Sequence, residues 1–173
     1  SKKHNIILND KNKNRIDVLK ANLNRLKFNA KIINEDFIKF NSKEKFDIII
    51  IDAPCSAIGT VRKNPEILFK NKSPNFNELI SLQENMLKKA AILLKTNGFI
   101  IYMTCSFLKI ETIDQINKFL KEYNNFVLSS FKINEDKNNY SKLIKNNFMI
   151  TVPDMIHNYS IDGYFAAYLK KTK

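Results

Sequence analysis

Two stretches of the sequence share one arrangement, an apolar segment followed closely by a Cys-Ser pair. Residues 46–51 read Phe-Asp-Ile-Ile-Ile-Ile and lead through an Asp-Ala-Pro turn to Cys55, while residues 98–103 lead almost directly to Cys105. The apolar run in the first segment is continuous instead of alternating, which predicts a strand buried on both faces. Open parallel sheets place their chemistry at the carboxyl ends of such strands. We therefore expect both cysteines at the same edge of one sheet.

Length and composition indicate one globular domain. The chain has 173 residues, of which 44% are hydrophobic, and we predict a single domain over residues 1–173. No apolar run approaches the ~20 residues of a membrane span, and the start has no signal-peptide layout. Two cysteines far apart in sequence are typical of reduced thiols in a cytosolic protein, so we expect a cytoplasmic location and no membrane partner. A disulfide between the two cysteines stays an open alternative.

The chain is strongly basic, with a formal net charge of +12 at pH 7. A basic surface favours a polyanionic partner, and nucleic acid is the first candidate. However, nearly all the positive charge is lysine and asparagine is abundant, as in a proteome biased towards Lys, Asn and Ile. The charge therefore has two interpretations, an RNA partner or ancestry.

Apolar periodicity predicts strands that alternate with helices. The predicted strands are residues 5–8, 30–34, 46–51, 98–103, 126–131 and 163–169, and the predicted helices are residues 11–26, 76–94 and 110–123. Asn97-Gly98 is expected to end the second helix with a left-handed cap. Residues 53–75 form a long loop of the kind that is often functional, whereas residues 132–159 give only a weak, Asn-rich signal. The alternation predicts an α/β fold with a mostly parallel sheet.

Three acids, Asp10, Asp36 and Asp52, each lie just past a predicted strand. Acids at this edge are well placed to accept hydrogen bonds from a ribose or an adenine amine. Alternatively, each acid caps the helix that follows its strand, and for any single acid taken alone this interpretation is favoured. Their common placement beside two cysteines favours a nucleoside cofactor, and both interpretations remain open.

The two cysteines could be nucleophiles or small buried hydrophobic residues. A reactive thiolate needs a lowered pKa, and Arg62 or Lys63 could supply the positive charge for it. His4 and His157 are isolated in the sequence, which argues against a Cys–His hydrolase. Two cysteines without ligand spacing also predict no metal site.

Residues 52–66, D-A-P-C-S-A-I-G-T-V-R-K-N-P-E, together with Thr-Cys-Ser at 104–106, resemble the RNA cytosine-5 methyltransferases. The subgroup of closest resemblance is that of the bacterial 16S ribosomal RNA enzymes of the Sun/RsmB type. Ala57, where many relatives carry glycine, fits this subgroup, as does the terminal Asp-Gly-Tyr-Phe at 162–165. The resemblance spans residues 5–170.

The resemblance implies a Rossmann-like class I fold that binds S-adenosylmethionine, with Asp10 at the cofactor ribose, Asp36 at its adenine end and Asp52 between cofactor and cytosine. The family binds the methionine part with a Gly-rich loop after its first strand. That strand and loop are not found in this sequence, nor is the N-terminal RNA-binding domain of the subgroup. We therefore expect the C-terminal catalytic part of a longer enzyme that is a monomer when complete.

The resemblance also implies a reaction. Cys105 would attack C6 of a cytosine in RNA, and 16S ribosomal RNA is the expected substrate. The attack would make C5 nucleophilic enough to take the methyl group. Asp52 would hydrogen-bond the N3/N4 edge of the base, and Cys55 would assist loss of the C5 proton and release of the product. The residues implied to contact RNA are Pro54, Arg62 and Lys63.

Two alternatives remain from other functional classes. A chain without the Gly-rich loop could be a non-catalytic RNA-binding fragment or a pseudoenzyme of the same fold. A generic nucleotide-binding α/β protein with structural cysteines is also compatible with the strand pattern, but it leaves the paired Cys-Ser motifs unexplained.

Overall fold

The computed structural model describes residues 5–69, 74–131, 140–156 and 159–173. The chain divides into two compact units, Ser1–Lys43 and Glu44–Lys173, and each is described by itself. The prediction of one domain over residues 1–173 stays a prediction. Across the described residues, the helices are too short or too polar to cross a membrane.

The first unit is a strand–helix–strand arrangement. Strands β1 (Ile7–Asn9) and β2 (Lys31–Ile33) pair in parallel, and helix α1 (Lys13–Arg25) connects them. The helix begins where the side chain of Asn12 accepts hydrogen bonds from two backbone N–H groups of the first turn. Its apolar face buries Ile16, as the helical spacing of apolar residues predicts.

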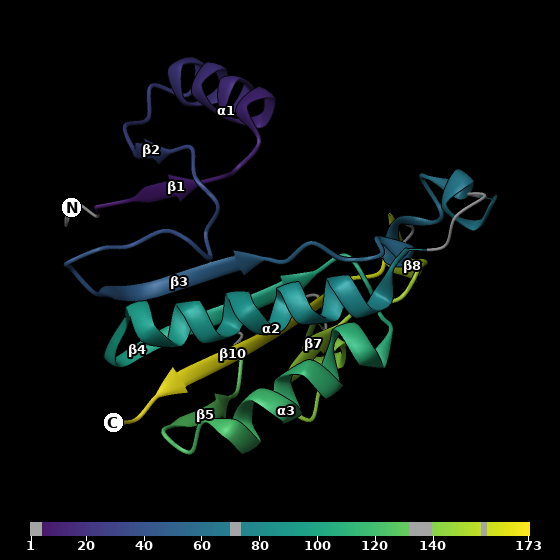
Figure 1. Ribbon diagram of the computed structural model, residues 1–173. Helices are drawn as coiled ribbons and strands as arrows, with labels where there is room; N and C mark the ends of the chain where they lie inside the picture. Colours follow the sequence, from purple (N-terminus) through teal and green to yellow (C-terminus); the bar gives the residue numbers. More distant parts are fainter. Residues whose placement is uncertain (1–4, 70–73, 132–139, 157–158) are drawn as a thin grey trace. The chain divides into compact units, whose positions relative to one another are not determined.

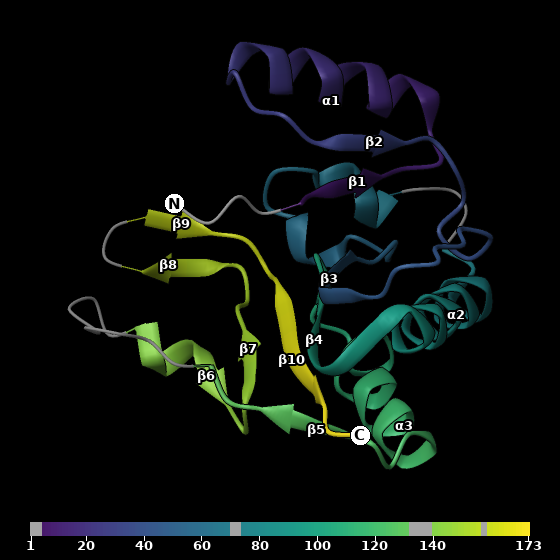
Figure 2. The same cartoon turned by 90° about the vertical axis from the view of Figure 1, so that its left-hand side faces the viewer.

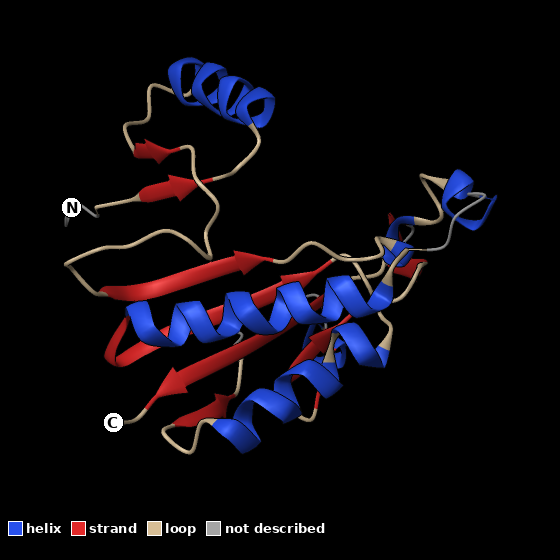
Figure 3. Ribbon diagram, viewed as in Figure 1, coloured by secondary structure: helices blue, strands red, loops and turns tan. Residues whose placement is uncertain are grey.

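The second unit is built on a six-stranded sheet with the order β3-β4-β10-β7-β6, and β5 also pairs with β10. The strands are β3 (Phe46–Asp52), β4 (Leu94–Thr104), β5 (Phe126–Ser129), β6 (Ile144–Lys145), β7 (Phe148–Ile150) and β10 (Phe165–Lys171). Strands β3 and β4 are parallel, and β10 is antiparallel to β4, β5 and β7. It follows that β3, β4, β5 and β7 point the same way and that β10 runs against them (Figure 3). The predicted α/β, Rossmann-like class is confirmed.

Strand β3 is not buried on both faces, so that prediction was wrong. Ile49 and Ile51 are buried, while the side chains of Ile48 and Ile50 are 54% and 62% exposed. Alternate residues of a strand point to opposite faces. Only the face towards α2 is covered, so the unbroken isoleucine run gives one buried and one exposed row.

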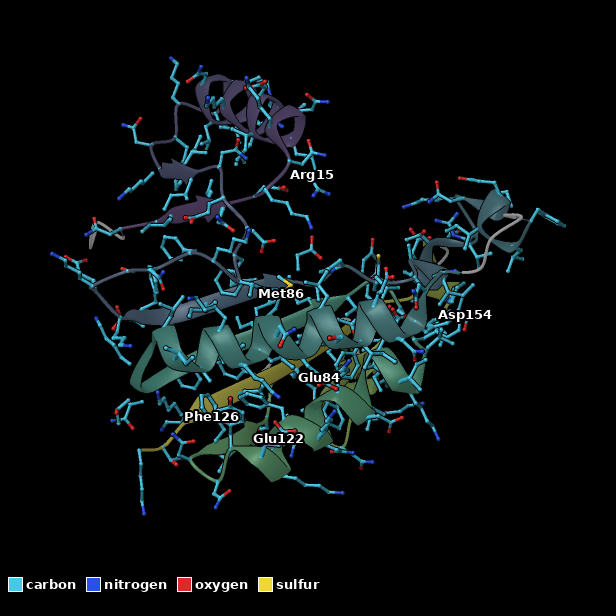
Figure 4. The ribbon with its side chains drawn as sticks, viewed as in Figure 1. Arg15, Glu84, Met86, Glu122, Phe126 and Asp154 are labelled. Carbon is cyan, nitrogen blue, oxygen red and sulfur yellow. The ribbon has the colours of Figure 1, made fainter. Side chains whose placement is uncertain are left out.

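Helices α2 (Phe76–Leu93) and α3 (Ile113–Glu122) lie on the same face of this sheet (Figures 1 and 2). The buried side chains between helices and sheet include Leu87, Ile116 and Phe119. On the outside, Glu84 and Glu122 form ion pairs across the two helices with Lys118 and Lys88 (Figure 4). This helical layer provides the rigid support beneath β3 and β4.

The end of α2 differs from the prediction. The helix stops at Leu93 and β4 begins at the next residue, so Asn97-Gly98 lies inside a strand. Asn97, not Gly98, takes the left-handed conformation, with φ of 62°. The pairing of β3 with β4 shifts register at this point, between Phe46 and Ile48. The Asn-Gly pair thus marks an irregularity in the strand pairing instead of a helix cap.

The weak stretch 132–159 contains short strands that periodicity did not predict. They are β6 and β7, which pair with each other, and β8 (Asp154–Ile156), which pairs with β9 (Tyr159–Ile161). Strands of two or three residues carry too little alternation to be detected in sequence. The connections also contain 3-10 turns: η1 (Ile58–Thr60), η2 (Pro65–Phe69), η3 (Lys109–Glu111) and η4 (Tyr140–Leu143).

Candidate active site

The two cysteines meet at the carboxyl ends of β3 and β4. Asp52 of β3 pairs with Met103 of β4, and the N–H of Ala53 donates to the carbonyl of Met103 at 2.9 Å. This register brings the Sγ atoms of Cys55 and Cys105 to 3.2 Å. Both thiols are free and partly buried, so the pair is not a disulfide. The prediction that one sheet edge carries both cysteines is confirmed.

The hydrogen bond between the two sulfurs makes them electrostatically unequal. The bond from the Cys55 side chain, above all, lowers the pKa of Cys105 from 9.0 to about 7, against the opposing effect of burial. The same bond, together with burial, raises the pKa of Cys55 far above its ordinary value. Cys105 is therefore the more readily ionised of the two thiols, and Cys55 is the one that keeps its proton.

Arg62 and Lys63 interact with an acid elsewhere in the second unit. Arg62 Nη2 and Lys63 Nζ lie 3.0 and 2.7 Å from the carboxylate of Asp162, which is almost fully buried. These cations hold the pKa of Asp162 below its ordinary value, chiefly through the Lys63 hydrogen bond. The lowered pKa of Cys105 comes from Cys55, so Arg62 and Lys63 are not needed to explain it.

Asp52, the last residue of β3, and Pro54 are exposed at the start of the loop that carries Cys55. Within the described part of the chain, the Asp52 carboxylate has no hydrogen-bond or ion-pair partner, which leaves it available to a ligand. Its negative charge opposes ionisation of Cys105, although more weakly than the Cys55 hydrogen bond favours it.

The backbone conformation of Ala57 accounts for the small side chain at this position of the motif. Its backbone is left-handed, with φ of 59° and ψ of 17°, at the start of η1. This conformation favours glycine because a Cβ atom crowds the neighbouring carbonyl. Alanine, the smallest side chain after glycine, therefore occupies a turn position that ordinarily favours glycine.

A buried carboxylate that the sequence analysis missed joins the two cysteine loops. Glu111 accepts hydrogen bonds from Ser56 Oγ at 2.6 Å and from Ser106 Oγ at 2.7 Å, both on Oε2. Its other oxygen accepts from the backbone N–H of Ser56 at 2.8 Å. The only sequence signal was the serine after each cysteine, and nothing in the sequence connected those serines to an acid.

Two glycines fix the far side of the Cys55 loop. The N–H of Gly59 donates to the carbonyl of Cys105 at 3.0 Å, and the N–H of Gly163 donates to the carbonyl of Gly59 at 2.7 Å. A Cβ atom on Gly59 would lie 1.9 Å from the carbonyl oxygen of Gly163. The three chain segments can approach this closely only because both residues lack side chains.

The strand-end acids of the first unit make local contacts. Asp10 accepts from the backbone N–H of Asn12 at 2.7 Å and pairs with Arg15 Nε at 2.8 Å (Arg15 is labelled in Figure 4). Asp36 accepts from the backbone N–H of Ile38 at 3.0 Å. Both acids are partly exposed. The cap of α1 is Asn12, so the prediction that Asp10 caps this helix was wrong, and Asp36 is followed by a turn instead of a helix. Both carboxylates stabilise local turns.

Among the residues that the structure describes, no cluster of three or more His, Cys, Asp or Glu side chains could hold a metal ion. The site is thus defined by two thiols, an exposed acid and a buried hydrogen-bond network on the sheet edge.

Comparison with known proteins identifies the family. The family model for 16S rRNA methyltransferase RsmB/F matches residues 1–170, and the chain belongs to this family. Ribosomal RNA small subunit methyltransferase B of Shewanella oneidensis is 39% identical over 109 residues, covering 61% of this chain and 26% of the relative. The 25S rRNA (cytosine-C(5))-methyltransferase nop2 of Schizosaccharomyces pombe is 33% identical over 177 residues, covering 96% of this chain and 29% of the relative. The chain thus spans less than a third of these relatives.

Solved structures support the same fold. NSun6 from Pyrococcus horikoshii, solved with SFG, superposes with a TM-score of 0.80 at 25% identity, over 99% of this chain and 42% of that protein. A methyltransferase homologue from the same organism superposes with a TM-score of 0.74 at 26% identity, over 96% of this chain and 53% of that protein.

Proposed function

We propose that this chain carries the catalytic cysteines of an S-adenosylmethionine-dependent RNA cytosine-5 methyltransferase. The observation that carries the proposal is the 3.2 Å contact between the sulfurs of Cys55 and Cys105, in which Cys105 has the lowered pKa. Membership of the 16S rRNA methyltransferase RsmB/F family and the cytosine-C(5) activity in the name of the nop2 relative support it. Ribosomal RNA is the proposed substrate, and the cytoplasm the proposed location.

The thiolate of Cys105 is the nucleophile. Its sulfur adds to C6 of the cytosine, forming an S–C6 bond while the electrons of the C5–C6 double bond move to C5. Bound S-adenosylmethionine supplies the methyl group for C5. Loss of the C5 proton then returns an electron pair to the ring, and the S–C6 bond breaks to regenerate the thiolate. Covalent catalysis of this kind replaces one difficult step by two easier ones.

Cys55 assists both the attack of Cys105 on the base and the release of the product. As a thiol it donates to the sulfur of Cys105, which stabilises the thiolate before attack and again when the S–C6 bond breaks. We propose that it also assists removal of the C5 proton. Asp52 has an exposed carboxylate at the same sheet edge and would bind the N3/N4 edge of the base, while Pro54 would contact the base.

The acids of the first unit fit the cofactor by their chemistry. Asp10 and Asp36 are partly exposed carboxylates at the ends of adjacent parallel strands, a placement suited to ribose and adenine donors. Asp10 would exchange the ion pair with Arg15, a side chain that is 66% exposed, for a ribose hydroxyl. A related protein solved with SFG, an analogue of S-adenosylmethionine, supports use of this cofactor.

RNA is proposed to reach the site as an unstacked base, because a cysteine at a sheet edge cannot reach C6 inside a helix. Lys63 has a side chain that is 62% exposed, and Arg62 one that is 37% exposed. Both could therefore meet phosphate while their partner Asp162 keeps the loop in place.

Substitution of each cysteine in the complete protein tests the assignment. With Cys105→Ala, methyl transfer to RNA should fall below detection, because the nucleophile is gone. With Cys55→Ala, a covalent protein–RNA adduct should accumulate and be visible on a denaturing gel. Full activity of Cys105→Ala would show that the nucleophile is another group.

Calorimetric titration of this chain with S-adenosylmethionine tests cofactor binding separately. Binding that is weakened by Asp10→Ala would support the proposed cofactor residues. Absence of binding would instead favour a non-catalytic RNA-binding fragment or pseudoenzyme of the same fold.

A further inference from the structure

We propose that Glu111 is a positioning residue that sets the distance between the two catalytic thiols. This inference rests on the proposed function, because it concerns how Cys55 and Cys105 are held together. It is carried by the hydrogen-bond network of Glu111, which lies behind the thiols and does not contact them. Because Glu111 touches neither sulfur, its positioning effect runs through the serines that follow the cysteines.

The connection between the loops runs through one oxygen atom. Oε2 of Glu111 accepts from Ser56 Oγ at 2.6 Å and from Ser106 Oγ at 2.7 Å. Ser56 directly follows Cys55, and Ser106 directly follows Cys105. A single atom thus holds the residue after each cysteine, so a shift of the carboxylate changes the separation of the two sulfurs.

Glu111 itself is rigidly placed. It is fully buried, and the hydroxyl of Tyr102 on β4 donates to its backbone carbonyl at 2.9 Å. Gln83 of α2 donates from Nε2 to Glu111 Oε1 at 3.3 Å and to the carbonyl of Pro54 at 2.9 Å. Gln115 of α3 in turn donates to the side-chain oxygen of Gln83 at 3.0 Å. Helices α2 and α3 therefore fix the Glu111 carboxylate, and this carboxylate fixes the loops that carry Cys55 and Cys105.

Four polar hydrogens converge on the two oxygens of Glu111: the N–H and O–H of Ser56, the O–H of Ser106 and one N–H of Gln83. A glutamine at this position offers one acceptor oxygen and would turn its own N–H groups towards these donors. Only a carboxylate accepts all four, and buried donors without a partner are costly. This explains why an acid lies here although, among the described residues, the donors to its carboxylate are uncharged.

The pH dependence of thiol alkylation by iodoacetamide tests this role, because the thiolate is the reacting form. Alkylation at Cys105 is followed by peptide mass spectrometry, with Cys55 left in place. In the wild-type chain, the midpoint of the pH–rate profile should lie at about 7. In Glu111→Ala, the sulfurs should separate, the bond from Cys55 should weaken, and the midpoint should rise towards 9.0.

The direction in which the alkylation midpoint shifts distinguishes the positioning role of Glu111 from the effect of its negative charge. The negative charge of Glu111 by itself opposes ionisation of Cys105, so removal of the charge alone would lower the midpoint. Removal of the positioning contact raises it. A midpoint that falls or stays at about 7 in a folded Glu111→Ala chain would overturn the inference.

Ser106→Ala keeps the carboxylate and removes the hydrogen bond from the residue after Cys105, while both bonds from Ser56 remain. It therefore tests the inference even if Glu111→Ala does not fold. Its midpoint should rise by less than that of Glu111→Ala, and an unchanged midpoint would contradict the role. Glu84→Ala is the matched control, since Glu84 pairs with Lys118 on the outside of the helical layer and should leave the midpoint unchanged. If the wild-type midpoint itself lay near 9.0, the proposed thiolate would be wrong, and the inference would fall with it.

Discussion

Strand ends in the two units carry polar side chains in equivalent places, but they are held in different ways. In the first unit, the side-chain carboxylates of Asp10 and Asp36 contact groups no more than five residues away. In the second, Cys55 meets Cys105 across 50 residues, Ser56 meets Glu111 across 55, and the partners Arg62 and Asp162 are 100 residues apart. Polar residues at the carboxyl ends of parallel strands are thus available for chemistry in both units. How firmly they are held depends on whether distant parts of the chain contact them.

The contrast has an energetic meaning. A local contact at an exposed turn exchanges readily with water, so its loss changes stability little and leaves its atoms available to a ligand. Buried contacts that join two loops are lost together, because each partner leaves the other unsatisfied. We therefore expect substitutions in the second unit to have large effects and those at the acids of the first unit to have small ones.

The largest effect is expected for Gly59→Ala. Its Cβ would lie 1.9 Å from the carbonyl oxygen of Gly163, a backbone atom that cannot move without shifting the segment before β10. We expect a loss of about 3 kcal/mol in the free energy of unfolding, at the upper end of overpacking effects. Urea denaturation followed by circular dichroism measures this loss. Ala57→Gly, in the same loop, should change stability by less than about 1 kcal/mol, and a similar loss in both variants would contradict steric locking at Gly59.

A smaller, pH-dependent effect is expected for Asp162→Asn, which removes the charge that Arg62 and Lys63 share. Because the folded pKa of Asp162 is held below the ordinary 3.8, its contribution to stability is fully present above that value. It is lost as the pH falls through the lowered pKa. The wild-type and variant proteins should therefore differ in thermal midpoint at pH 7 and converge in strong acid.

The control for this comparison is Asp47→Asn, since Asp47 pairs with Lys95 but its side chain is 82% exposed. It should change the thermal midpoint less than Asp162→Asn at pH 7. If the two variants behaved alike, or if the Asp162→Asn difference persisted unchanged in acid, the ion pair would not lock the loop.

The smallest effect is expected for Asp10→Asn in the first unit. Asparagine keeps an oxygen for the N–H of Asn12 and loses only the ion pair with Arg15, which is largely exposed. We expect a change below about 1 kcal/mol in thermal unfolding, close to that of Asp17→Asn in the exposed pair with Lys20. A much larger loss would show that this strand end is held as firmly as the cysteine loops.

Much of the fold could be predicted because it depends on local patterns. The amphipathic spacing placed α2 over residues 76–94, and the structure has it at Phe76–Leu93. The short strands within 132–159 escaped detection because long-range pairing, not periodicity, forms them. The reversed direction of β10 was also not predictable, since its sequence fits a strand that runs either way.

The exposed isoleucines of β3 likewise show what the sequence of a single strand cannot predict. An unbroken run of isoleucines fits two covered faces, yet Ile48 and Ile50 are exposed. Which face is covered depends on where the helices pack, and this information is not contained in the strand. Likewise, the use of Arg62 and Lys63 as partners of Asp162 depends on a residue far along the chain.

The sequence by itself determined which residues reach the sheet edge, because strand length and turn residues are local properties. It placed Asp52 and Cys55 after one strand and Cys105 after its neighbour. Only the tertiary structure decided that the sulfurs lie 3.2 Å apart, that Cys105 has the lowered pKa and that Glu111 joins the two loops. Those properties depend on strand register and on hydrogen bonds between distant segments, which form only when the chain is folded.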